Sequence, residues 1–99
     1  MSRVGFRPAA SADIEAAYDW YEEQRLGLGD EFSAAVDAAL ASILAFPEAH
    51  PVVHRRARRF LLERFPYGLY YLVLEGQVII VACMHAARDP ESWRSRLDG

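Results

Sequence analysis

Two clusters of arginine, histidine and aromatic residues contain the side chains of this sequence that could carry chemistry. The first cluster lies between Arg58 and Tyr71, where arginines accompany two aromatic, strand-forming segments. The second follows the last strand-forming segment, between His85 and Trp93. Arginine offers a planar fork that binds carboxylate or phosphate and stacks on aromatic rings. On one small sheet, the two clusters would form a cationic, aromatic surface suited to an anionic or protein partner.

Within these clusters we expect a target-binding surface made of Arg59, Arg64, His85, Arg88 and Trp93. Three of these residues have structural alternatives: His85 can hydrogen-bond at a strand end, Arg88 can pair with a carboxylate in a turn, and Trp93 can pack the C-terminal tail. His85 is the one histidine of the set, the residue type that most often acts as a general acid or base. No complete catalytic motif is present, which favours a small protein that works by binding.

A metal site is not expected. His50 and His54 are four residues apart, a spacing that aligns two ligands on a helix. Pro51 lies between them and opposes a helix there, and no cysteine is near to complete a site. We expect no metal and no other cofactor.

Helical periodicity predicts two helices in the first half of the chain. A short strand over residues 4–7 ends at Pro8, as expected at a sheet edge. Ser11 is expected to cap the first helix, with Asp13 and Glu15 in its first turn. A second helix opens at residues 30–31, after a glycine-containing turn, and stops at Phe46-Pro47. Its apolar stripe consists of Phe32, Val36, Leu40, Ile43 and Leu44. The short connection implies an antiparallel helical hairpin.

The second half of the chain predicts strands. Residues 47–57 are expected to be a loop, and strands are expected over 59–64, 69–74 and 77–84, the last two joined by a tight turn. Residues 90–97 are expected to form a short helix. The result is one α+β domain over residues 1–99, ordered β-α-α-β-β-β with a C-terminal helix. The helical hairpin packs on one face of a mainly antiparallel sheet, and residues after 85 or another chain must cover the other face.

Composition restricts the class of protein. The 99 residues suit one domain, and no apolar run approaches the roughly 20 residues needed to span a membrane. The N-terminus has no apolar signal-peptide core, and the single cysteine, Cys83, is expected to be buried. We therefore expect a cytoplasmic protein without a membrane partner.

The net charge of −3 hides two halves of opposite sign. Residues 9–49 contain nine acids against Arg25 alone, whereas residues 50–99 contain eight arginines against five acids. No lysine is present. The sequence indicates an acidic helical side and a basic sheet side, although a solvated acidic surface with scattered arginines is the simpler alternative.

In their order and spacing these residues resemble the ParE branch of the RelE/ParE toxin superfamily, along nearly the whole chain. The resemblance rests on these segments: Ala12-Asp13-Ile14, Trp20-Tyr21-Glu22, Gly27-Leu28-Gly29-Asp30-Glu31-Phe32, Phe46-Pro47, Arg59-Phe60-Leu61, Arg64-Phe65-Pro66-Tyr67, Tyr70-Tyr71, and His85-Ala86-Ala87-Arg88-Asp89-Pro90 with Trp93 and Arg96. It implies the toxin half of a type II toxin–antitoxin pair, which a ParD-like antitoxin neutralises by wrapping around it. We expect an antitoxin-binding set formed by Arg55, Arg56, Arg58 and Tyr70, because clustered arginines would attract an acidic antitoxin segment or phosphates; a solvated arginine loop is the alternative.

The resemblance leaves two activities open. ParE-like toxins act on DNA gyrase, whereas RelE-like relatives cleave mRNA on the ribosome with several Lys and Arg residues and often a C-terminal Tyr. This chain has no lysine and no tyrosine beyond Tyr71. A ribonuclease would use His85, Arg59 and Arg64, but a non-catalytic gyrase inhibitor fits the sequence better. A third possibility is a degenerate member that binds antitoxin without toxicity. We expect no sequence-specific binding of nucleic acid.

Overall fold

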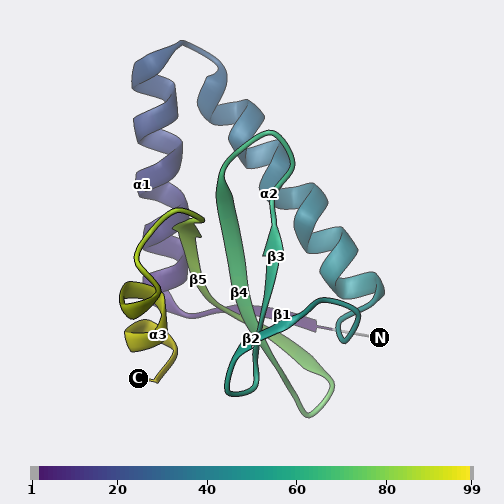
Figure 1. The fold of residues 1–99 in the computed structure, drawn as a ribbon. Helices are drawn as coiled ribbons and strands as arrows, with labels where there is room; N and C mark the ends of the chain where they lie inside the picture. Colours follow the sequence, from purple (N-terminus) through teal and green to yellow (C-terminus); the bar gives the residue numbers. More distant parts are fainter. Residues whose placement is uncertain (1–2, 99) are drawn as a thin grey trace.

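Helices cover both faces of a single sheet in the computed structural model, which describes residues 3–98 (Figure 1). In chain order the elements are β1 (Arg3–Phe6), α1 (Pro8–Gln24), α2 (Leu28–Ala45), β2 (Val52–His54), β3 (Ala57–Leu61), β4 (Tyr67–Leu74), β5 (Gln77–His85) and α3 (Pro90–Asp98). This confirms the predicted α+β fold with a helical hairpin and a C-terminal helix. Within the described residues, no helix is both long enough and apolar enough to cross a membrane.

The strands form one sheet in the order β1-β5-β4-β3-β2. β1 pairs in parallel with β5, and the other neighbours are antiparallel. The predicted position of β1 at a sheet edge is therefore confirmed. In β5 one extra residue, Val81, stands between the partners of Tyr70 and Tyr71, which makes a β-bulge. The bulge places both Val81 and Ala82 in the same core.

The predicted start of the first helix is wrong. α1 begins at Pro8, and Arg7 precedes it in extended conformation without a side-chain cap. Proline suits the first helical position because its fixed φ matches the helix and its missing N–H would have no partner there. Ser11 therefore lies inside the helix, and the first turn contains no acidic residue.

The turn between α1 and α2 depends on a carboxylate of α1. Gly27 has a φ of +90°, and its N–H donates to both Glu22 carboxylate oxygens at 3.1 Å. The N–H of Gly29 donates to Glu22 Oε1 at 2.9 Å. The Glu22 carboxylate thus accepts hydrogen bonds from N–H groups that have no partner within α2, at the helix start where a negative charge is favourable.

The predicted loop over residues 47–57 is wrong in its second half, because that segment contains β2. β2 pairs with β3 through a turn at Arg55 and Arg56, where Arg55 has a φ of +53°. Hairpin turns of this kind favour glycine or asparagine, so a turn built from arginines gives no sequence signal. β3 also lies earlier than predicted, and Glu63 and Arg64 belong to the connection to β4.

Two cores lie on opposite faces of the sheet. The larger core, between the sheet and the helical hairpin, includes Phe32, Val36, Ile43, Phe65, Leu69, Tyr71, Val78 and Ile80. The smaller core, between the sheet and α3, contains Tyr70, Val81, Ala82, Met84 and Trp93. Of the two covers expected for the second face, residues after 85 or another chain, residues after 85 provide the cover over this part of the sheet.

Candidate functional site

A pocket of about 240 Å³ lies between α1 and the C-terminal end of β5. It contains His85 and Arg88, two residues predicted for the target-binding surface, and both are exposed. The turn after β5 is fixed by backbone hydrogen bonds from Arg88 N–H to His85 carbonyl at 3.0 Å and from Ala86 N–H to Pro66 carbonyl at 2.7 Å. The pocket therefore has a defined rim at the end of β5.

Aromatic side chains line the same pocket. Trp20 is 54% exposed and contributes to the pocket from α1. The ring of Tyr67 packs edge-on against His85, with 5.4 Å between centroids. Burial raises the pKa of the Tyr67 hydroxyl, and the positive charge of Arg88 opposes that shift. Cationic and aromatic groups thus meet at one site.

Asp13 joins three elements at the side of this pocket. Its carboxylate accepts the backbone N–H of Cys83 at 3.0 Å, at the part of β5 that extends beyond β1. Arg96 of α3 donates to both Asp13 oxygens, at 2.8 and 3.2 Å. This bidentate pair is mostly buried, with side-chain exposures of 18% for Asp13 and 30% for Arg96. Its charge is therefore internally neutralised, which leaves Arg88 as the net charge of the pocket rim.

Cys83 forms part of the pocket floor and is buried, as predicted. Burial, assisted by the negative charge of Asp13, raises the pKa of its thiol to about 12. The thiol is thus protonated at neutral pH and poorly reactive.

Trp93 and Tyr70 do not lie on the surface that we predicted for them. Trp93 is 6% exposed and stacks on Tyr70, with 5.4 Å between ring centroids. Tyr70 is fully buried, and its hydroxyl has no hydrogen-bond partner among the described residues. As placed here, Trp93 and Tyr70 present almost no surface to a partner. The packing alternative for Trp93 is the one that the structure supports.

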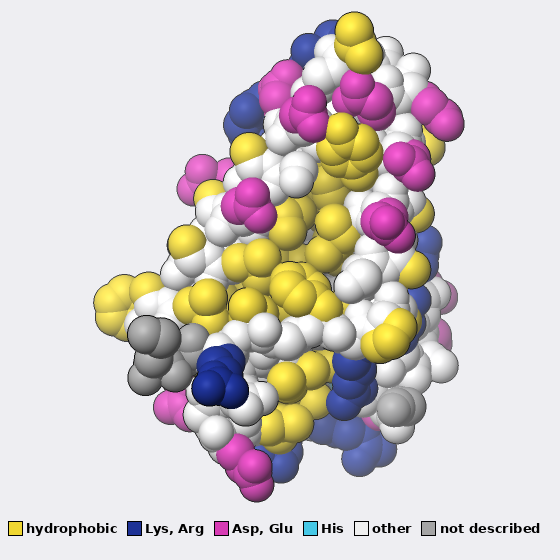
Figure 2. Space-filling view, turned by 180° about the vertical axis from the view of Figure 1, so that it is seen from behind, with side chains coloured by type: hydrophobic (Ala, Val, Ile, Leu, Met, Phe, Trp, Pro, Cys, Tyr) yellow, Lys and Arg dark blue, Asp and Glu magenta, His cyan; other side chains and the backbone are white. Residues whose placement is uncertain are grey.

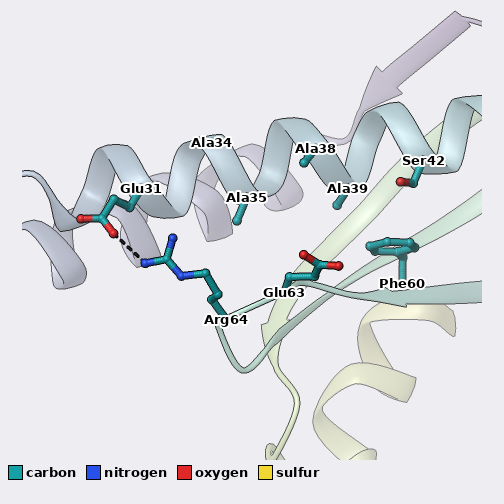
Figure 3. A pocket seen from close by; sticks show the side chains of 9 residues that line it. All are labelled: Glu31, Ala34, Ala35, Ala38, Ala39, Ser42, Phe60, Glu63 and Arg64. Carbon is teal, nitrogen blue, oxygen red and sulfur yellow. Dashed lines mark hydrogen bonds and ion pairs between the residues drawn. The ribbon is translucent and has the colours of Figure 1, made fainter.

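Arg64 reaches across a different groove of about 290 Å³, between α2 and the connection after β3 (Figure 3). Its guanidinium donates to Glu31 Oε1 at 2.7 Å. Glu31 also accepts from Arg25 at 2.8 Å, and hydrogen bonds from these two arginines lower the pKa of the Glu31 carboxyl. In Figure 3 the small side chains of α2, such as Ala35 and Ala39, point across this groove toward Glu63 and Phe60.

The proposed ribonuclease residues are not brought together. Arg59 pairs with Tyr70 in the sheet, on the face that α3 covers, and its stem lies over Gly68. His85 pairs with Tyr67, whose ring faces the helical hairpin. Since residues opposite one another in a sheet share a face, Arg59 and His85 point to opposite sides. The structure therefore places Arg59 and His85 on different faces of the sheet, and Arg64 lines a different groove from His85.

Arg55, Arg56 and Arg58 do lie together, around a second concavity of about 250 Å³. Arg58 donates to the backbone carbonyls of Glu48 at 3.0 Å and His50 at 2.7 Å. Arg55 donates to Asp98 of α3 at 2.7 Å. Arg56 is exposed and has no ion pair within the described residues. The three arginines thus form a cationic surface at the turn between β2 and β3.

The two histidines before this surface have separate surroundings. His54 Nε2 lies 2.7 Å from Asp98, and this contact is the main cause of the lowered pKa of the Asp98 carboxyl. The ring of His50 packs edge-on against Phe60. Within residues 3–98, no three His, Cys, Asp or Glu side chains are grouped as metal ligands would be.

The acidic half of the sequence maps onto the helical hairpin. Figure 2 shows acidic side chains gathered over the hairpin, beside a band of apolar side chains, while several arginines lie toward the opposite end. The predicted acidic helical side is therefore visible as one face of the molecule.

Sequence reasoning missed Trp20 and Asp13 as parts of the site. The position of Trp20 next to Tyr21 offered a signal, because adjacent helical residues project about 100° apart, so one of the two tends to lie nearer the edge of the buried face. Asp13 gave no such signal, since its partners Cys83 and Arg96 are distant in sequence.

Comparisons with known proteins agree with this architecture. The family model of the ParE toxin of type II toxin–antitoxin systems, parDE, matches residues 4–90. A solved structure described as the chromosomal ParDE system from P. aeruginosa is similar, with a TM-score of 0.65 and 20% identity, covering 86% of this chain and 96% of that chain. The isolated E. coli RelE toxin is also similar, with a TM-score of 0.60 and 17% identity, covering 97% of this chain and 96% of that chain. No curated protein sequence matches this chain. Because the family model spans most of its length, the chain belongs to the ParE toxin family of type II toxin–antitoxin systems.

Proposed function

We propose that this toxin arrests growth by binding and inhibiting DNA gyrase, without itself catalysing a reaction. The observation that carries the proposal is the separation of Arg59, Arg64 and His85. RNA cleavage without a metal requires a base, an acid and cations around one phosphate. Here Arg59 and His85 point to opposite faces of the sheet, and Arg64 is paired with Glu31. His85 Nδ1 also receives a hydrogen bond from the Ala87 N–H at 3.1 Å.

We further propose that a ParD-like antitoxin neutralises the toxin and that its acidic groups contact Arg55, Arg56 and Arg58. The three arginines share one concavity, and Arg56 is exposed. Carboxylates of a partner would gain charge-assisted hydrogen bonds there. We place the active protein in the cytoplasm, as a single domain over residues 1–99, where gyrase and the antitoxin would meet it.

The proposal is tested by adding the purified, antitoxin-free chain to DNA gyrase and relaxed plasmid. Supercoiling and trapped double-strand breaks are measured over a range of toxin concentrations. We expect dose-dependent inhibition that the cognate antitoxin reverses. A folded, growth-arresting chain that leaves gyrase unaffected would contradict the proposal.

The same preparation is added to translating ribosomes, with mRNA cleavage as the readout. Cleavage that Arg59→Ala abolishes would establish the ribonuclease alternative. A chain that arrests no growth on induction would be the degenerate, antitoxin-binding member.

A further inference from the structure

We infer that the pocket between α1 and the end of β5 is where the toxin binds an acidic side chain of its protein target, with Trp20 as the aromatic anchor and Arg88 as the cationic contact. This inference rests on the proposed function, because it assigns the surface through which the toxin would bind its target. The inferred aromatic anchor is Trp20 of the first helix. It replaces Trp93 of the C-terminal helix, which is buried.

The exposure of Trp20 is the first observation. More than half of its surface, 54%, is accessible, although Tyr21 beside it is packed against Phe32 at 5.3 Å and Phe65 at 4.9 Å between ring centroids. A large exposed aromatic next to a concavity is typical of the residues that dominate binding energy at protein interfaces.

The charge of the pocket is the second observation. Within residues 3–98, no carboxylate lies within 4.0 Å of the Arg88 guanidinium. Asp13 is the one acid among the described residues that line the pocket. Both terminal guanidinium nitrogens of Arg96 donate hydrogen bonds to its carboxylate. The neighbouring Asp89 uses its carboxylate to accept the Glu91 N–H at 3.0 Å. Arg88 therefore gives the pocket a positive charge that no ion pair within residues 3–98 engages.

The shape of the pocket is the third observation. Its floor is formed by the buried residues Ala17 and Cys83, and Tyr67 forms part of its wall. A volume of about 240 Å³ exceeds the share of about 30 Å³ that one water molecule occupies in the liquid, so the pocket has room for a side chain. A Glu or Asp side chain fits this chemistry because its methylene groups meet the apolar floor and its carboxylate meets Arg88.

The occupant is therefore an acidic segment of the target protein. A basic segment is disfavoured because Arg88 would repel it.

The test compares Trp20→Ala and Arg88→Glu with the matched surface controls Leu26→Ala and Arg3→Glu. Leu26 is 87% exposed in the turn between the helices, and Arg3 is exposed on β1. Each variant is induced in cells at equal abundance, and its unfolding transition and its binding to the cognate antitoxin are measured in vitro. We expect Trp20→Ala and Arg88→Glu to lose growth arrest and to bind gyrase at least about 30-fold more weakly, as when a central interface contact is removed. The controls should match the original protein.

A photo-cross-linking amino acid in place of Glu23, which is exposed on α1 beside Trp20, tests the chemistry of the occupant in growth-arrested cells. We expect the adduct to map to a segment of gyrase that carries Asp or Glu, and Arg88→Glu should abolish it. An adduct on a segment without acidic residues, or on nucleic acid, would overturn the inference.

Different results would contradict the proposal that gyrase is the target and the inference that the pocket binds the target. If the chain arrests growth without affecting gyrase, the proposed target is wrong, and the toxicity of the two pocket variants still decides the role of the pocket. Folded pocket variants that remain fully toxic would overturn the inference, and so would variants that lose antitoxin binding instead. A chain that never arrests growth overturns both.

Discussion

Asp13→Ala provides the most stringent test of how the site is held together. The substitution removes the acceptor for the Cys83 N–H and the partner of Arg96. Leaving a buried N–H without a partner costs about 1–3 kcal/mol. The pair with Arg96 is mostly but not fully buried, so we assign it no more than about 1 kcal/mol. The expected loss is therefore about 1–4 kcal/mol of the free energy of unfolding.

The assay is urea denaturation of the purified chain and of the variants Asp13→Ala, Arg96→Ala and the double variant. We expect Arg96→Ala to cost no more than about 1 kcal/mol, because Asp13 keeps its hydrogen bond to the β5 backbone. The coupling energy of the double-mutant cycle should be about 1 kcal/mol. Glu15→Ala is the matched control, since Glu15 is exposed on the same helix.

A loss below about 0.5 kcal/mol for Asp13→Ala, the range of ordinary surface substitutions, would refute this reasoning. A coupling energy of zero would show that the bidentate pair contributes no stability beyond its separate members.

Three further outcomes follow from the packing. Gly29→Ala should lower stability by about 1–3 kcal/mol in thermal melts, because its Cβ would lie 2.9 Å from the Tyr18 carbonyl oxygen; an unchanged melting temperature would contradict this contact. Trp93→Ala should cost about 3–5 kcal/mol, so that antitoxin binding falls together with toxicity; selective loss of toxicity in a stable variant would restore Trp93 as a surface anchor. Because burial raises its pKa to about 12, Cys83 should react with iodoacetamide at pH 8 far more slowly in the folded than in the urea-unfolded chain; equal rates would show that the thiol is accessible.

The helices and the central hairpin were predictable because hydrophobic periodicity specifies them directly. The stripe of α2 that includes Phe32, Val36 and Ile43 faces the core as the spacing indicated. The near-continuous apolar runs of β4 and β5 also predicted strands covered on both faces, and α3 provides the second cover.

Other features depend on contacts between distant residues, so local patterns did not indicate them. β2 was missed because its turn uses Arg55 in a left-handed conformation, which arginine seldom adopts. The start of α1 was predicted too late. Ser11 belongs to the residue types favoured as helix caps, whereas the helix in fact starts with Pro8, a residue type favoured at the first helical position.

The site was predicted in part. His85 and Arg88 do meet in one pocket, and Arg55, Arg56 and Arg58 do meet in another. Arg59 and His85 lie on opposite faces of the sheet. That separation could be deduced only once the register of β3, β4 and β5 was known. The burial of Trp93 follows from its stacking on Tyr70, a contact between the tail and the sheet that no spacing in the sequence indicates.

The central claim is that the toxin acts by binding gyrase rather than by turnover, and a stoichiometric titration tests it most directly. Gyrase at a fixed concentration well above the dissociation constant is mixed with increasing amounts of the antitoxin-free chain, and residual supercoiling is measured after a constant time. The account predicts that inhibition rises linearly and saturates at a small whole-number ratio of toxin to gyrase, unchanged by longer incubation. Unaffected supercoiling, or loss of activity at far lower ratios that grows with incubation time, would contradict it.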